Sequence, residues 1–328
     1  MRPAFLARLI NGPAFDPCVF VRPCHGREAV LFDCGRISGL SNREILSVRR
    51  LFVSHAHMDH FMGFDHVLRT ILHRRDPLHV YGPEGMTGRV LAKLASYTWN
   101  LTGDYPLEVV VHEVAEGHVA TCRAAAADGF AQGPAVRAGR TGATVYSCPR
   151  YRVDAVALDH DVPCLGFALA EPFHVGIRAG ALQGFGYRSG PWVGLLKERI
   201  MTGCTDTAIA VDTVSGVCEI GVERLIEELV VVSDGQKIAY LTDIRASREN
   251  IARFAEIARH ADTLFIEAYY LHERAGEAFD KGHLTALQAG LIARELQART
   301  VIPMHVSPRY QDRVKLLERE LLEAWKGL

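Results

Sequence analysis

The sequence predicts an α/β fold for this chain of 328 residues, and two observations carry the prediction. Short apolar runs of strand length alternate with longer segments in which apolar residues recur at helical spacing. Several of the strand-like runs end in an acidic residue or a histidine. Because the ends of successive strands can meet along one edge of a layered fold, the same pattern also predicts a functional site.

The composition is that of an ordinary globular protein. Hydrophobic residues make up 48% of the chain, and the net charge of −1 gives no overall attraction for polyanions. No apolar run reaches the roughly 18 residues of a membrane span, and residues 4–10 are too short for a signal peptide. The eight cysteines include no Cys-x-x-Cys pair, which favours reduced thiols and a cytoplasmic location.

The first predicted strands lead to a candidate acidic residue. Residues 19–21 and 29–32 are the expected strands, and the second ends in Asp33-Cys34-Gly35. A carboxylate at a strand end before a glycine can point into a cleft, but it can equally cap the following turn.

The next strand-like run, residues 51–53, leads into Ser54-His55-Ala56-His57-Met58-Asp59-His60. His55 and His57 alternate in an extended backbone, so their side chains should converge on one point. Asp59 and His60 come where the chain turns into a helix, so their side chains can face a second point nearby. Imidazole and carboxylate ligands suit zinc, with manganese or iron as alternatives. This loop is therefore predicted to bind metal.

Beyond the loop, apolar spacing predicts helices at residues 62–75 and 86–99, with strands at 78–81 and 107–112. Residues 123–144 are rich in Ala, Gly and Arg, and we expect them to form a flexible insertion. Strands at 151–158 and 165–169 then flank His160. A lone histidine there would be structural, but beside a site that lacks a third imidazole it becomes a candidate ligand.

The second half repeats the strand-end pattern. Residues 229–233 and 238–241 are expected to pair as a hairpin around Asp234-Gly235, and the second of them leads to Asp243. Strands at 263–266 and 301–304 lead to Glu267 and His305. Helices are expected after Ser247, after a Thr285/Gln288 capping box, and at the C-terminus.

The His-x-His-x-Asp-His pattern of the metal loop resembles the metallo-β-lactamase superfamily, which implies an αββα sandwich. Within it, the chain resembles ribonuclease Z, which trims tRNA precursors after the discriminator base. The matching stretches are Phe32-Asp33-Cys34-Gly35, the metal loop, His160, Asp243, Glu267, His283-Leu284-Thr285 and His305 through Tyr310. Two departures are Ile266 in place of a histidine and Leu284 in place of a serine, and no glycine-rich opening is recognisable around residues 11–13.

The resemblance implies two divalent metal ions, zinc first among them. It assigns His55, His57 and His160 to one metal, Asp59, His60 and His305 to the other, and Asp243 to a bridge between them. It makes Asp33 a support for the metal loop. Two such metals activate a shared hydroxide and clamp an in-line displacement at phosphorus. Asp59, Glu267 and His283 are the implied catalytic residues, the last two donating a proton to the leaving oxygen.

Residues 172–200 contain six glycines and four cations expected to bind substrate: Arg178, Arg188, Lys197 and Arg199. Phe185, Tyr187 and Trp192 lie between the charges, where we expect their rings to stack on bases. Ribonuclease Z proteins carry a glycine-rich arm here, and the stretch from Ser189 to Lys197 resembles its end. We therefore expect one domain over residues 1–328 with this arm as an RNA exosite. The alternative is an ordinary flexible loop.

Two functions remain open. The first is a phosphodiesterase of the ribonuclease Z type that cleaves tRNA precursors or related RNA. The second is a small-molecule hydrolase of the same fold, acting on a cyclic nucleotide, a sulfate ester or a lactone. The complete ligand set argues against a non-catalytic RNA-binding protein. Homodimer formation is left open.

Overall fold

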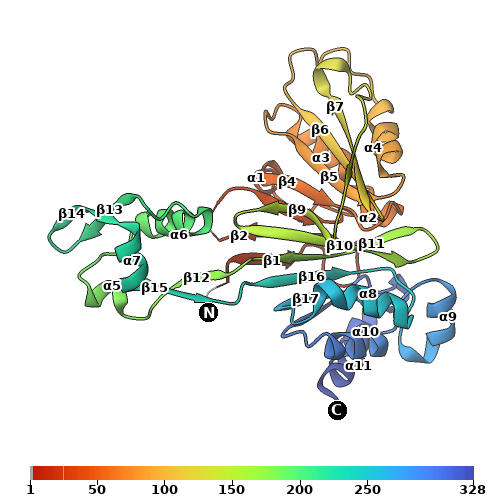
Figure 1. The fold of residues 1–328 in the computed structure, drawn as a ribbon. Coiled ribbons are helices and arrows are strands. Elements are labelled where there is room, and N and C mark those ends of the chain that lie inside the picture. Colours follow the sequence, from red (N-terminus) through yellow and green to blue (C-terminus); the bar gives the residue numbers. More distant parts are fainter. Residues whose placement is uncertain (1–2, 25) are drawn as a thin grey trace. The chain divides into compact units, whose positions relative to one another are not determined.

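The computed structural model describes residues 3–24 and 26–328 (Figure 1). By its internal contacts the chain divides into two compact units. The larger consists of Phe5–Tyr146, Val153–Leu169 and Lys237–Leu328, and the smaller mainly of Ser147–Arg152 and Ala170–Gln236. This division differs from the single domain expected from the sequence.

The larger unit contains an eight-stranded sheet whose strands follow chain order. Its strands are β1 (Phe5–Leu9), β2 (Val19–Pro23), β3 (Ala29–Phe32), β4 (Val48–Phe52), β5 (Leu78–Pro83), β6 (Glu108–Ala115), β7 (His118–Ala125) and β8 (Val136–Gly139). The central pairs from β3 to β6 are parallel and the flanking pairs antiparallel. Parallel strands carry their C-terminal ends to one edge, so the loops after β3 and β4 lie together.

A second sheet has the order β18-β17-β16-β11-β10-β9. Its strands are β9 (Thr144–Cys148), β10 (Tyr151–Asp159), β11 (Pro163–Ala170), β16 (Lys237–Leu241), β17 (Thr263–Glu267) and β18 (Val301–Met304). β16, β17 and β18 are parallel neighbours. Asp243, Glu267 and His305 lie at or just beyond the same end of these three strands.

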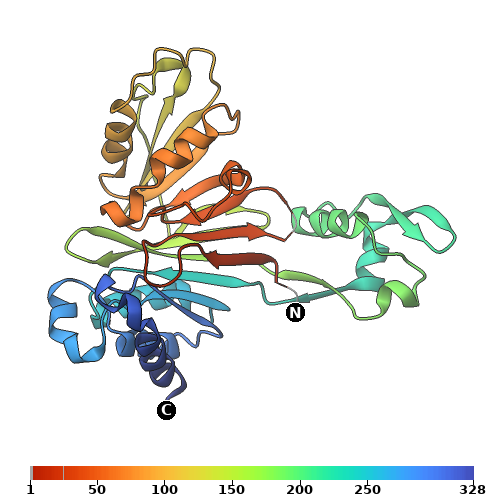
Figure 2. The same ribbon diagram turned by 180° about the vertical axis from the view of Figure 1, so that it is seen from behind.

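The two sheets pack face to face through aromatic rings. The Phe167 ring lies 5.7 Å from that of Phe32 and 5.6 Å from that of Phe52, and Phe32 also stacks on Tyr240. The outer face of the first sheet packs against α1 (Asn42–Ser47), α3 (Phe64–Ile71) and α4 (Met86–Ala95), and that of the second against α8 (Arg248–Ala258), α10 (Ala286–Glu295) and α11 (Val314–Lys326) (Figures 1 and 2). The predicted αββα sandwich is confirmed.

Local sequence signals explain where several helices begin. The Thr285 hydroxyl accepts a hydrogen bond from the Gln288 amide, and the Thr285 amide donates to the side-chain oxygen of Gln288, which is the predicted capping box of α10. Ser247 caps α8 through the Asn250 amide.

Of the helices in the described residues, none is long and apolar enough to cross a membrane.

Residues 123–144 are more regular than expected. They include the end of β7, a 3₁₀ turn at Ala126–Asp128 and β8, which pairs with β7. The backbone finds a partner on the edge of the first sheet, so low apolar periodicity did not mean a flexible insertion. β8 is exposed throughout, and for that reason it carries no apolar signal.

The smaller unit has its own core. It contains α5 (Ala181–Gly184), α6 (Trp192–Thr202), α7 (Val222–Leu229) and two antiparallel pairs, β12 (His174–Ile177) with β15 (Val230–Ser233) and β13 (Ala208–Thr213) with β14 (Gly216–Gly221). Leu196, Val211 and Leu225 are fully buried within it. The unit runs to Gln236, so the predicted arm boundary at residue 200 falls inside α6.

One expected pairing is wrong. Residues 230–233 form β15 and pair with β12, whereas Lys237–Leu241 form β16 between β17 and β11. The Asp234-Gly235 turn signal therefore marks the passage from the smaller unit to the larger and not a hairpin.

Candidate metal centre

The strand ends deliver the site residues to one edge of the sandwich. Asp33 follows β3, and Asp243 and His305 follow β16 and β18. All three have left-handed backbones, with φ of 53°, 49° and 52°. Non-glycine residues rarely adopt this conformation, and strain of this kind concentrates at functional sites. The turn sends each side chain inward, where all three are buried.

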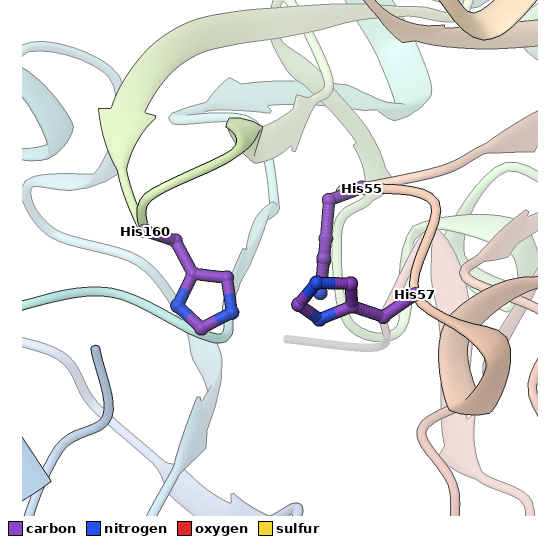
Figure 3. A group of neighbouring side chains, drawn as sticks. All are labelled: His55, His57 and His160. Carbon is purple, nitrogen blue, oxygen red and sulfur yellow. The ribbon is translucent and has the colours of Figure 1, made fainter. Parts of the chain in front are cut away.

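His55, His57 and His160 form the first group of candidate ligands. Their rings converge from the metal loop and from the loop between β10 and β11 (Figure 3). The ring centroids of His55 and His57 are 4.3 Å apart, and those of His55 and His160 are 5.0 Å apart. One nitrogen from each of the three lies within 4.8 Å of the others. The other nitrogen of His160, Nδ1, is 2.8 Å from the Gly282 carbonyl, which fixes the ring.

Asp59, His60 and His305 form the second group, with ligand atoms again within 4.8 Å. The Asp59 Oδ2 atom is 3.1 Å from His305 Nε2 and 3.7 Å from His60 Nε2. His60 is fully buried, while Asp59 remains partly exposed and lines the cavity above the site.

Asp243 lies between the two groups. Its Oδ2 is 2.6 Å from His60 Nε2 and 3.6 Å from His55 Nε2, and its Oδ1 is 2.9 Å from His305 Nδ1. One carboxylate thus contacts a ligand of the first group and two of the second, which fits the bridging role that the resemblance implies.

The buried polar atoms at the centre lack ordinary partners. Nε2 of His55, Nε2 of His60 and both oxygens of Asp243 make no hydrogen bond within the described residues. Unpaired buried polar atoms are costly. Metal ions would satisfy all four, so the donor set fits them.

The charges of the two groups differ. Burial, together with the charge of His60, lowers the pKa of His55 to about 2, and burial also lowers the pKa of His57. Burial acts in the same sense on His60, but the carboxylates of Asp243 and Asp33 outweigh it and raise its pKa to about 10. In the metal-free protein, His55 and His57 are therefore neutral at pH 7, whereas His60 carries a proton.

Asp33 supports the metal loop from behind. Its Oδ1 accepts from the Ser54 amide at 2.6 Å, and its Oδ2 accepts from the Ser54 hydroxyl, the Tyr240 hydroxyl and His60 Nδ1 at 2.6–2.7 Å. Of the two roles that the sequence left open, the structure shows the side chain facing inward. The carboxylate orients His60 so that Nε2 faces the metal position. Ser54 and Tyr240 were not predicted, since neither is a metal ligand type.

Glu267 and His283 form a pair beside Asp243. Their facing atoms, Glu267 Oε2 and His283 Nδ1, are 3.0 Å apart, and His283 Nδ1 is also 3.0 Å from Asp243 Oδ1. Glu267 Oε1 accepts from the amides of Ile244 and Leu284. Burial lowers the pKa of His283, but Glu267 and Asp243 together raise it to about 9. The ring of Tyr269, which the sequence did not single out, stacks on His283.

A cavity of about 220 Å³ opens above these groups. It is lined by His57, Asp59, His160, Asp161, Val162, Asp243, Tyr269, Lys281, His283 and His305. The lining is mainly polar, as a site for an anionic group requires, and it differs from the apolar pockets that take drug-like ligands.

The four expected substrate-binding cations all lie in the smaller unit. Arg178 donates to the Glu227 carbonyl at the end of α7, Arg188 is exposed, and Lys197 and Arg199 are half-buried on α6. The structure contradicts part of the arm hypothesis, because Tyr187 and Trp192 are packed into the core of the unit. Of the three aromatic residues expected to stack on bases, only Phe185 is exposed.

Comparison with known proteins decides the family. No family profile matches the chain. Ribonuclease Z of Deinococcus radiodurans is 32% identical over 316 residues, which cover 93% of this chain and 91% of that protein. The chain belongs to the ribonuclease Z family. Ribonuclease BN of Proteus mirabilis is 27% identical over 287 residues, 85% of this chain and 79% of that protein.

Solved structures agree on the fold of this ribonuclease Z family member. The short form of human tRNase Z matches with a TM-score of 0.54 and 20% identity, covering 93% of each chain. The metallo-β-lactamase fold protein YhfI of Bacillus subtilis matches with a TM-score of 0.56 and 13% identity, covering 98% of this chain and 93% of that one. The predicted superfamily and branch are both confirmed.

Proposed function

We propose that this protein is a metal-dependent endoribonuclease that processes the 3′ ends of tRNA precursors. The observation that carries the proposal is the convergence of the two ligand groups on Asp243, beside the Glu267–His283 pair. Its relatives named ribonuclease Z support RNA as the substrate.

Two metal ions would be held by His55, His57 and His160 and by Asp59, His60 and His305, with Asp243 shared. When bound, they lower the pKa of a water molecule and neutralise charge that develops on the phosphoryl oxygens. Imidazole and carboxylate donors favour zinc over manganese and iron.

The remaining residues perform the proton chemistry. Glu267 is fully buried and takes two backbone donors on Oε1, so its Oε2 is held facing His283 Nδ1. His283 carries a proton at neutral pH in the metal-free protein. With Nδ1 hydrogen-bonded to Glu267 Oε2, Nε2 is the atom that donates to the leaving ribose oxygen.

A small-molecule hydrolase remains the second candidate. The burial of Tyr187 and Trp192 favours it, because it removes two of the three rings that were expected to hold RNA bases. The cysteines of the described residues form no disulfide with one another, which supports a cytoplasmic location.

The test is to incubate the metal-loaded protein with a tRNA precursor carrying a 3′ trailer and, separately, with a panel of small esters. The panel should contain a chromogenic phosphodiester, a cyclic nucleotide, a sulfate ester and a lactone. Specific removal of the trailer supports the proposal. Turnover of a small ester with an untouched precursor favours the second candidate.

A further inference from the structure

Three cations gather around one carboxylate next to the metal site. Glu277, in α9 (Ala275–Asp280), accepts from Arg274 at 2.8 Å and from Lys281 at 3.1 Å, and Arg309 contacts both of its oxygens at 3.1 and 3.3 Å. We call these four residues the Glu277 cluster.

The charges of the Glu277 cluster do not balance. Three cations face one anion, so two positive charges are left for solvent or for another anionic group. The cations are accessible, with Lys281 56% and Arg274 44% exposed. Exposed ion pairs add little stability on average, so a stabilising role does not by itself account for the second and third cation.

The Glu277 cluster is tied to the site on two sides. Lys281 lines the cavity above the metal ligands and lies two residues before His283. Arg309 follows His305 by four residues and lies over the Tyr270 ring at 5.5 Å. An anionic chain with one phosphate in the cavity therefore has Lys281 on the wall beside it.

We propose that the Glu277 cluster binds the backbone phosphate of RNA next to the one being cleaved. This inference rests on the proposed function, since it takes the cavity to hold the scissile phosphate of an RNA strand. Arginine and lysine are the usual partners of nucleic-acid phosphates, and their contacts position the strand without reading its sequence. In the free protein, Glu277 holds the cations together in place of the phosphate.

A purely structural role makes a different prediction. If the cluster only clamps α9, loss of Glu277 and loss of Lys281 should both reduce melting temperature and activity in parallel. If it is a phosphate site, Glu277 competes with the ligand, and the two substitutions should act in opposite directions on RNA.

The experiment measures kcat/KM for a tRNA precursor against KCl concentration, and equilibrium binding of a labelled single-stranded RNA. Variants are Lys281→Ala, Lys281→Arg, Arg274→Ala and Glu277→Gln. The matched control is Arg299→Ala. Arg299 is an exposed arginine paired with Asp262 and precedes β18, the strand whose other end leads to His305. Melting temperatures and hydrolysis of a small diester are recorded for each variant.

We expect Lys281→Ala to lower kcat/KM for RNA about tenfold at low salt. The slope of log kcat/KM against log KCl concentration, called the salt slope here, should become shallower by about one. The loss should exceed any loss on the diester, and Lys281→Arg should restore most of it. Arg274→Ala should weaken RNA binding in the same way, whereas Glu277→Gln should leave it undiminished or stronger. Arg299→Ala should match the intact protein.

Two outcomes would overturn the phosphate site and leave the proposed function standing. One is an unchanged salt slope in Lys281→Ala. The other is a loss of RNA cleavage that is similar in Lys281→Ala and Glu277→Gln and follows their melting temperatures. RNA binding with these variant effects but without precursor cleavage would count against the proposed function and for the phosphate site. No RNA binding by the intact protein would overturn both.

Discussion

The rings of Tyr269 and His283 lie flat against one another, with centroids 3.8 Å apart and planes 2° from parallel. Tyr269 is held by backbone hydrogen bonds to both sides of the site, from its own amide to the Leu284 carbonyl and from the Ser307 amide to its carbonyl. It therefore fixes the plane of His283 from a rigid position, and we regard it as a positioning residue for the proposed proton donor.

Tyr269→Ala should lower kcat on a tRNA precursor about tenfold. A stacked ring pair is worth about 0.5–1.5 kcal/mol, and this energy holds His283 in the orientation for proton donation. Tyr269→Phe keeps the stacking surface and should retain most of the activity. Metal content should be unchanged in both variants. Steady-state kinetics with elemental analysis checks this, and equal losses in the two variants would assign the effect to the hydroxyl group.

Asp243→Ala should remove hydrolysis and reduce bound metal below two ions per chain, since the bridging carboxylate contacts ligands of both groups. His283→Ala should keep its metal and slow turnover about 10²–10⁴-fold, as loss of a general acid does. Elemental analysis of the two variants separates these roles. The exposed Asp128, in a surface turn, provides a matched Asp→Ala control. Metal loss in His283→Ala equal to that in Asp243→Ala would contradict the division.

Metal affinity should depend on pH at the position that His60 and His305 form, and little at the position that His55 and His57 form. His55 and His57 have lowered pKa values and bind without releasing protons near pH 7. His60, with a pKa of about 10, and His305, whose pKa burial lowers but Asp243 raises well above its usual range, must each lose a proton. Affinity there should rise with pH, about tenfold per unit for each proton released. Competition with a zinc-binding dye between pH 6.5 and 8 measures the zinc affinity of both positions. The same pH dependence at the two positions would contradict the difference in protonation between their ligands.

The core of the site could be predicted because it follows from strand ends. A buried strand is visible in sequence as an apolar run, and the residue that follows it must lie at the sheet edge. This rule identifies five candidate site residues from the sequence, without any knowledge of interatomic distances: His55, His160, Asp243, Glu267 and His305. Tyr240 and Ser54 escaped prediction because they act through Asp33. They lie 207 and 21 positions from it in the chain, and hydrogen bonds between such residues leave no local pattern.

The errors came where local signals were read without their tertiary partners. Asp234-Gly235 has the composition of a hairpin turn, yet β15 pairs with β12, more than fifty residues earlier. Alternating aromatic and basic residues suggested a flexible binding surface, but Tyr187 and Trp192 find a core formed by α6, α7 and β13. That core includes residues beyond position 200, which the predicted arm left out.

Replacing residues 170–236 with a short linker should weaken precursor cleavage mainly through KM. Within the smaller unit, the Glu171 amide donates to the Gln236 carbonyl at 2.9 Å, so a short linker can join the two ends of the segment. We expect hydrolysis of a chromogenic phosphodiester to be retained, because every proposed metal ligand lies outside the segment.

Two readouts test this prediction. The salt dependence of precursor cleavage should become shallower in the shortened protein, as loss of phosphate contacts requires. Unchanged KM and salt dependence would remove Arg178, Arg188, Lys197 and Arg199 from the proposed binding surface.

Zinc titration of the metal-free protein tests most directly whether a two-metal centre cuts tRNA precursors. Protein stripped with a chelator is titrated with zinc while cleavage of a 3′-extended tRNA precursor and bound metal are followed together. Cleavage should be absent in the stripped protein and reach its maximum at about two ions per chain, with a single cut that releases the trailer. A precursor left intact by protein that has bound its metal and hydrolyses a small ester would contradict the account.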